Sequence, residues 1–205
     1  MQASELFNQP NTILLDGGMG TMLQAAGMKL GTRPEDLNLE NPELIRSIHA
    51  KYAAAGSRVV NANTFGASPH KLADSKYTLE EVITAGIANC KQAVAPYGAL
   101  VTLDVGPLGE LLEPSGTLAF EDAVAEYGRI VRAGVAAGAD ILYFETFTDL
   151  YEMKAALLAA KENSTLPIMA SMSFEANGRT FTGCTVESFA ATARGLGANA
   201  VGINC

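Results

Sequence analysis

The fold is decided by the stretch Gly138-Ala139-Asp140-Ile141-Leu142-Tyr143-Phe144-Glu145. In it a glycine ends a helical segment, an apolar run follows, and a polar residue stands at the end of that run. The same arrangement runs from Gly56 to Asn63 and from Gly197 to Asn204, and the polar residue always lies seven positions after the glycine. A repeated unit of helix, glycine, buried strand and polar strand tip predicts an active site built from strand ends.

Six apolar segments are predicted to be strands, and helical sequence separates them. The strands are expected at residues 12–16, 59–63, 100–105, 141–145, 168–174 and 200–204. The helices are expected at residues 41–55, 79–94, 120–137, 150–161 and 186–195, the first of them with Asn41 as its N-cap. Strands this apolar are buried on both faces, so the sheet is predicted to be parallel with the helices outside it.

Two α/β architectures fit these units. A doubly wound sheet could be complete with six strands. A (β/α)8 TIM barrel, which typically takes about 250 residues, would have only about its first six β/α units in this chain. No interdomain linker or low-complexity segment divides the sequence, so residues 1–205 are expected to form one domain.

The composition excludes several classes of partner. The net charge is −8 and the lysines and arginines are scattered, so neither nucleic acid nor an anionic membrane is an expected partner. No apolar run reaches the roughly 18–20 residues that span a membrane, and the N-terminus lacks the features of a signal peptide. The three cysteines, Cys90, Cys184 and Cys205, do not form a disulfide framework, and these observations together predict a cytoplasmic protein.

Polar residues stand at the tips of the predicted strands. Any one of them could simply satisfy a loop backbone, but acids, amides and a thiol converge on one face if the sheet curls into a barrel. They are Asp16, Asn63, Asp104, Glu145, Ser173 and Cys205. The loop after Asp16 is glycine-rich but lacks the third glycine of a dinucleotide fingerprint, so we expect its backbone N–H groups to bind a carboxylate rather than NAD.

The remaining histidines and cysteines have simpler interpretations. His49 falls in the middle of a predicted helix and is expected to pack there, and His70 is expected at the start of a surface helix. Cys90 is interpreted as a small buried hydrophobe, whereas Cys184 follows the fifth predicted strand, from which it could face the site. No lysine stands at a predicted strand tip, which argues against a Schiff-base aldolase.

Six short motifs are similar, in order and spacing, to those of the homocysteine S-methyltransferase family. They are Leu15-Asp16-Gly17-Gly18-Met19-Gly20-Thr21, Asn63-Thr64-Phe65-Gly66, Asp104-Val105-Gly106-Pro107, Phe144-Glu145-Thr146, Asn177-Gly178-Arg179-Thr180 and Gly202-Ile203-Asn204-Cys205. The resemblance covers essentially the whole chain. The stretches 106–110 and 113–116 favour the homocysteine-binding module of the cobalamin-dependent branch over the betaine-dependent branch.

The resemblance implies a (β/α)8 barrel that holds one zinc ion on three cysteines. The first of these ligands falls on Cys205, and the other two form an adjacent pair in a glycine-flanked motif after a later strand. This sequence has no adjacent cysteine pair. The chain is therefore expected to be a C-terminally incomplete methyltransferase barrel, with two further zinc ligands beyond residue 205, and to be inactive by itself.

The resemblance also implies the reaction and the residues that carry it. Zinc would bind the thiol of homocysteine, and the resulting thiolate would attack a methyl group and form methionine. Asp16 and Glu145 would bind the ammonium group of the substrate, backbone N–H groups near Gly17 and Thr64-Phe65 would bind its carboxylate, and Asn204 would orient the site beside Cys205. The full set of implied substrate-binding residues is Asp16, Gly17, Asn63, Thr64, Phe65, Glu145 and Asn204.

The methyl donor stays open at this point. It could be methylcobalamin, delivered by cobalamin and folate domains outside this chain, or S-methylmethionine in a stand-alone enzyme. Two other interpretations also stay open. One is a non-catalytic fragment that lacks the zinc site, and the other is a different barrel enzyme such as a lyase, against which the missing lysine counts.

Overall fold

The computed structural model describes residues 3–29 and 31–205. Its centre is a five-stranded parallel sheet made of β1 (Val59–Asn61), β2 (Leu100–Val105), β3 (Ile141–Phe147), β4 (Ile168–Met172) and β5 (Ala200–Ile203). The strands lie in the sheet in their order along the chain. A doubly wound sheet reverses its strand order at a switch point, so this order is that of a (β/α)8 barrel, of which the described residues form an open part.

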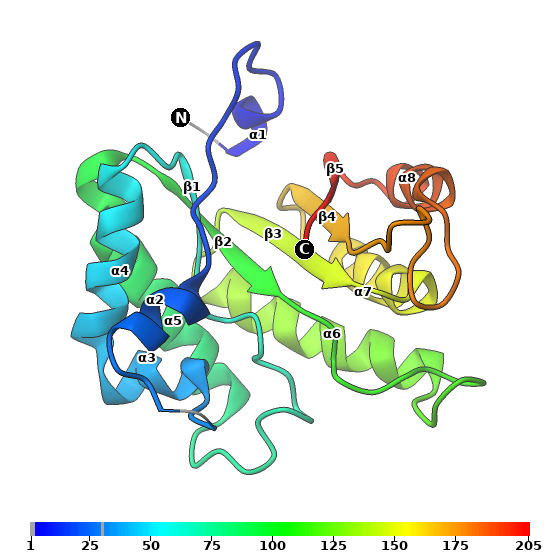
Figure 1. Ribbon diagram of the computed structural model, residues 1–205, viewed down its shortest axis with the longest axis horizontal. Helices are drawn as coiled ribbons and strands as arrows, with labels where there is room; N and C mark the ends of the chain where they lie inside the picture. Colours follow the sequence, from blue (N-terminus) through cyan, green and yellow to red (C-terminus); the bar gives the residue numbers. More distant parts are fainter. Residues whose placement is uncertain (1–2, 30) are drawn as a thin grey trace.

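The first predicted strand, at residues 12–16, is not a strand. Only Leu15 forms a parallel bridge, with Val59 of β1, so the prediction of six strands was wrong by one. The segment pairs only on its β1 side within the described chain, and helix α2 (Met19–Ala25) begins shortly after it. It lies beside β1, at the edge of the sheet, where the strand before β1 would lie in a barrel (Figure 1).

The other strands differ from the prediction only at their ends. β3 continues past Glu145 to Phe147, because its pairing with β4 shifts register between Phe144 and Phe147. β1, β4 and β5 end earlier than predicted, at Asn61, Met172 and Ile203. The residues beyond these ends form the loops that surround the candidate site.

Five helices lie along the outer side of the curved sheet (Figure 1). They are α4 (Pro42–Ala54), α5 (Leu79–Val94), α6 (Phe120–Ala136), α7 (Leu150–Asn163) and α8 (Val186–Gly195), and each was predicted to within a few residues. α4 begins as expected, because the side chain of Asn41 accepts a hydrogen bond from the Leu44 N–H at 3.3 Å. The short elements are α1 (Ala3–Leu6), α3 (Leu37–Glu40), and the 3₁₀ turns η1 (Pro34–Asp36) and η2 (Ala95–Tyr97).

Apolar side chains cover both faces of the sheet, as the strand sequences predicted. Between the sheet and the outer helices, Tyr127 of α6 packs against Phe144 and Phe147 of β3, with ring centroids 6.2 and 5.9 Å apart. On the inner face, a separate cluster includes Ile141 and Tyr143 of β3. None of the helices in the described chain is long and apolar enough to cross a membrane.

Candidate active site

A cavity of about 260 Å³ opens at the carboxyl ends of the strands. Three carboxylates line it: Asp16 from the segment beside β1, Asp104 from β2 and Glu145 from β3. This acidic pocket is also lined by Gly17, Met19, Asn61, Asn63, Phe65, Asn204 and Cys205. Within the described chain no lysine, arginine or histidine lines it, so its only charged side chains are acidic.

A second lobe of about 410 Å³ adjoins the acidic pocket and shares Asp104, Glu145 and Cys205 with it. Its wall adds Pro34 and Glu35 from η1. Cys205 lines both lobes.

Asp16 is held at one of its two carboxylate oxygens. Its Oδ2 accepts a hydrogen bond from the Asn61 N–H at 3.1 Å, whereas Oδ1 is buried and has no hydrogen-bond partner among the described residues. Burial is the main reason that the pKa of Asp16 rises from 3.8 to about 7, and the charge of Glu145 adds to it. Near neutral pH this carboxyl group is therefore partly protonated, and a bound cation could replace the proton.

Asp104 is more deeply buried, with 7% of its surface exposed. The Thr64 hydroxyl fixes its backbone from both sides, accepting from the Asp104 N–H at 3.1 Å and donating to the Asp104 carbonyl at 2.8 Å. Its Oδ1 is buried and unpaired in the described part of the molecule. Burial raises the pKa of Asp104 well above its usual range, and the charges of Glu145 and Asp16 raise it further.

Glu145 is tied to the end of β5. Its Oε2 accepts a hydrogen bond from Asn204 Nδ2 at 3.3 Å, and burial raises its pKa. The Oδ1 atom of Asn204 accepts from Ser171 Oγ at 3.1 Å, so Asn204 joins β5 to β4 as well. Ser173, another predicted tip residue, donates from Oγ to the Asn204 carbonyl at 3.1 Å.

Two of the predicted substrate-binding residues direct their polar groups into the protein. Asn63 lines the acidic pocket, but its Nδ2 donates to the Pro34 carbonyl at 2.8 Å and to Asn38 Oδ1 at 2.9 Å. The Thr64 N–H donates to the Ala62 carbonyl at 2.8 Å, and its hydroxyl is bonded to Asp104. Gly17 and Phe65 line the pocket, and their backbone N–H groups have no partner among the described residues.

The remaining predicted residues are placed as follows. His49 is fully buried in α4, and His70 is exposed, with its Nδ1 2.7 Å from Glu110 Oε1. Cys90 is buried, as interpreted from the sequence. Cys205 is exposed, and its Sγ lies 3.9 Å from Thr146 Oγ1.

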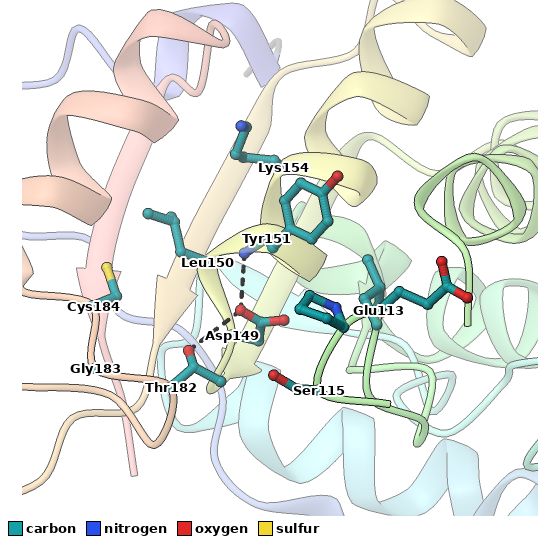
Figure 2. A pocket seen from close by; sticks show the side chains of 11 residues that line it. Glu113, Ser115, Asp149, Leu150, Tyr151, Lys154, Thr182, Gly183 and Cys184 are labelled. Carbon is teal, nitrogen blue, oxygen red and sulfur yellow. Dashed lines mark hydrogen bonds between the residues drawn. The ribbon is translucent and has the colours of Figure 1, made fainter. Parts of the chain in front are cut away.

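Cys184 does not line the acidic pocket but a separate cavity of about 670 Å³ (Figure 2). This cavity lies between the loop after β2, the start of α7 and the loop after β4. Asp149 lines this cavity and caps α7, where its Oδ1 accepts from the Tyr151 N–H at 3.0 Å and from Thr182 Oγ1 at 3.3 Å (Figure 2). The two cavities share no lining residue among those that the structure describes, so Cys184 is not part of the acidic pocket.

The described residues do not form a metal site of their own. They contain no group of three His, Cys, Asp or Glu side chains that could hold a metal ion, and Cys205 is the single thiol at the acidic pocket. A structural or catalytic zinc site needs three or four such ligands in a fixed arrangement. Of the three cysteine ligands that the resemblance implies, the described chain therefore supplies only Cys205.

Sequence reasoning named Asp104 as a strand-tip residue but did not include it among the substrate-binding residues. Its position directly before Val105-Gly106-Pro107, at the end of an apolar strand, was the available signal. Asn61 lies in β1, as predicted, and its contact with Asp16 has no signal in the sequence because it is made by the backbone N–H.

Comparisons with known proteins indicate the family of this chain. The family model described as "Homocysteine S-methyltransferase" matches residues 13–205. Methionine synthase from Mycobacterium tuberculosis (strain ATCC 25618 / H37Rv) is 28% identical over 208 residues, which is 93% of this chain but only 17% of that protein.

Solved structures of similar fold include a homocysteine methyltransferase. The metallated form of the homocysteine methyltransferase MmuM from Escherichia coli superposes with a TM-score of 0.88 at 25% identity, over 100% of this chain and 78% of that one. The carboxyl transferase domain of Rhizobium etli pyruvate carboxylase has a TM-score of 0.53 at 14% identity, over 78% of this chain and 23% of that one, and shows a likeness of fold alone.

Proposed function

The chain belongs to the homocysteine S-methyltransferase family, and we propose that its acidic pocket binds homocysteine for methylation of the homocysteine thiol to methionine. The observation that carries the proposal is a pocket with three carboxylates and, within the described chain, no basic side chain in its lining. Such a pocket selects a cationic group, and the α-ammonium of an amino acid is one.

The two poles of an amino acid have counterparts in the acidic pocket. Asp16 and Glu145 are proposed to bind the ammonium, because both are partly buried carboxylates on its wall. The unpartnered N–H groups of Gly17 and Phe65 are proposed to bind the carboxylate. The homocysteine side chain would then extend toward Cys205, which lines both lobes.

The other predicted residues support these groups. Thr64 is proposed to position Asp104, and Asn63 to hold η1 against the pocket, since their polar groups are bonded to those parts of the protein. Asn204 is proposed to orient Glu145 through its hydrogen bond to Oε2.

For zinc, we propose only that Cys205 is a candidate ligand. The described residues do not fit a zinc site, since they supply no group of three ligands. No step proposed for this chain therefore depends on the metal.

The methyl donor is proposed to be methylcobalamin or S-methylmethionine. This chain spans 17% of the methionine synthase and 78% of the MmuM structure. Methylcobalamin as the donor would need cobalamin and folate domains, which residues 1–205 do not include. A cytoplasmic location is also proposed, and the three free cysteines fit a reducing compartment.

Calorimetric titration with L-homocysteine tests the proposal. Glu145→Gln is expected to weaken binding by about 1–3 kcal/mol, because a charge-assisted hydrogen bond is lost. Glu121→Gln, at an exposed position in the first turn of α6, is the matched control and should leave binding unchanged. An unchanged dissociation constant for Glu145→Gln, or no binding to the parent chain at millimolar ligand, would contradict the proposal.

A further inference from the structure

The acidic pocket has one carboxylate more than the proposed contacts of Asp16 and Glu145 require. Asp104 is buried, with 7% of its surface exposed, and it lines both lobes of the cavity. Its Oδ1 has no hydrogen-bond partner among the described residues. Because native proteins pair nearly all of their buried polar atoms, an unpaired and buried carboxylate oxygen on a cavity wall indicates a missing donor.

The position of Asp104 is fixed independently of its side chain. The Thr64 hydroxyl bonds to both its N–H and its carbonyl, at 3.1 and 2.8 Å. The backbone therefore needs nothing from the carboxylate. The side chain is also not used as a helix cap or in an ion pair with any described residue.

The missing donor is more compatible with an organic cation than with a metal ion. No group of three carboxylates, thiols or imidazoles in the described chain is arranged to hold a metal. An ammonium group instead carries three N–H donors that point in different directions. Three carboxylates line the pocket, those of Asp16, Asp104 and Glu145, and the Oδ1 atoms of Asp16 and Asp104 have no partner among the described residues.

We propose that Asp104 accepts the third N–H of the substrate's ammonium group and thereby makes the site selective for a primary amine. The inference rests on the proposed function, because it assumes that an amino acid occupies the acidic pocket. An N-methylated amino acid has one N–H fewer, so it would leave one of the buried oxygens unpaired and would bring a methyl group against it. An analogue without the amine would leave all of them unpaired.

The proposal has a proton balance that can be measured. Burial raises the pKa of Asp104, Asp16 and Glu145, and Glu35 adds further negative charge near Asp104. The carboxyl groups of the empty pocket therefore hold protons more tightly than free carboxyl groups do, and the incoming ammonium replaces such protons. Binding of L-homocysteine should release protons to the buffer, and the observed heat of binding should depend on the ionisation heat of that buffer.

The test compares three ligands by calorimetric titration: L-homocysteine, N-methyl-L-homocysteine and 4-sulfanylbutanoic acid, which lacks the amine. Asp104→Asn is expected to weaken L-homocysteine binding by about tenfold to a hundredfold and to leave 4-sulfanylbutanoic acid unaffected. It should also reduce the proton release. The matched control is Asp122→Asn, at an exposed position in the first turn of α6, which should change none of these values.

Each result either supports or overturns the proposal. An equal loss of affinity for L-homocysteine and 4-sulfanylbutanoic acid in Asp104→Asn would show a merely structural role. If circular dichroism shows that Asp104→Asn does not fold, the test is made on the parent chain with two ligands. The parent chain should bind N-methyl-L-homocysteine about tenfold more weakly than L-homocysteine, and equal affinities would overturn the inference.

Failure of this inference is distinguishable from failure of the proposed function. If the parent chain does not bind L-homocysteine at all, the proposed function is wrong and this inference falls with it. If Glu145→Gln weakens binding but Asp104→Asn does not, only the role of Asp104 is wrong.

Discussion

The side chain of Asn204 bonds to Thr146 at two points. Its Nδ2 donates to Thr146 Oγ1 at 2.7 Å, and its Oδ1 accepts from the Thr146 N–H at 3.2 Å. Thr146 has a φ angle of 64°, a left-handed conformation that is unfavourable for a β-branched residue. A single side-chain amide, directly after β5, therefore holds a strained residue of β3 that follows Glu145.

Asn204→Ala is expected to release this strained conformation and to turn Glu145 away from its present direction. Binding of L-homocysteine should weaken by about tenfold or more, because the hydrogen bond to Glu145 is lost with the two to Thr146 and the one from Ser171. The free energy of unfolding should fall by at least about 1–2 kcal/mol. Calorimetric titration and urea unfolding measure the two effects. Thr146→Gly is the companion variant: it removes the strain but keeps the Asn204 amide, so it should bind the ligand better than Asn204→Ala.

Asp16 should make the stability of the protein depend on pH. Its pKa is raised in the fold from 3.8 to about 7, so the folded state binds this proton more tightly than the unfolded state does. Stability that is fully present below about pH 4 is then lost as the pH rises through about 7, and the loss approaches about 4 kcal/mol. Asp16→Asn should be more stable than the parent chain at pH 8 and nearly equal to it at about pH 4. Urea unfolding at both pH values, with Asp122→Asn as the exposed control, checks this, and a pH-independent difference would count against it.

His49 should have the opposite dependence on pH. It is fully buried in α4, neither ring nitrogen has a partner in the described chain, and burial lowers its pKa from 6.5 to about 4. Stability present above pH 6.5 is therefore lost as the pH falls toward 4, by about 3 kcal/mol in total. His49→Leu should remove most of this acid sensitivity, whereas His70→Leu, at an exposed position, should not. Identical acid unfolding curves for the parent chain and His49→Leu would show that another group is responsible.

The 205-residue chain should bind zinc only weakly. Cys205 supplies one thiol, and no second thiol of the described residues lines the acidic pocket. Zinc affinity depends on several ligands held in a fixed arrangement. After dialysis against zinc and then against metal-free buffer, atomic spectroscopy should find a sub-stoichiometric amount, and Cys205→Ser should not lower it further. Stoichiometric zinc that Cys184→Ser removes would instead point to the cavity of Figure 2.

The periodicity of the sequence predicted most of the fold, because buried strands and amphipathic helices have distinct apolar patterns. It could not predict that residues 12–16 form only a bridge. The length of a strand depends on whether other strands pair with it on both sides, and this is not visible in the local pattern. The choice of a barrel over a doubly wound sheet required the family resemblance, because both architectures use the same units. Only the strand order in space separates them.

The sequence predicted that several strand-tip residues lie close together, but not how their side chains are bonded. Strand tips converge in any parallel barrel, so Asp16, Glu145 and Cys205 could be brought together from the sequence. The direction of a side chain depends on contacts that are distant in sequence. Asn63 turns toward Pro34, and Thr64 bonds to Asp104, and neither contact has a signal in the local pattern.

The strand order of the sheet has a consequence for how the site forms during synthesis. Each strand from β2 to β5 pairs with the strand that precedes it in the chain. Each new strand can therefore pair, as it leaves the ribosome, with a strand that has already been synthesised. Asp16, Asp104 and Glu145 can therefore assemble while the rest is still being translated. The hydrogen bonds that fix Glu145 and Thr146 come from Asn204, which emerges about sixty residues later. A nascent chain arrested before Asn204 clears the exit tunnel should hold all the acids of the pocket and still bind homocysteine poorly.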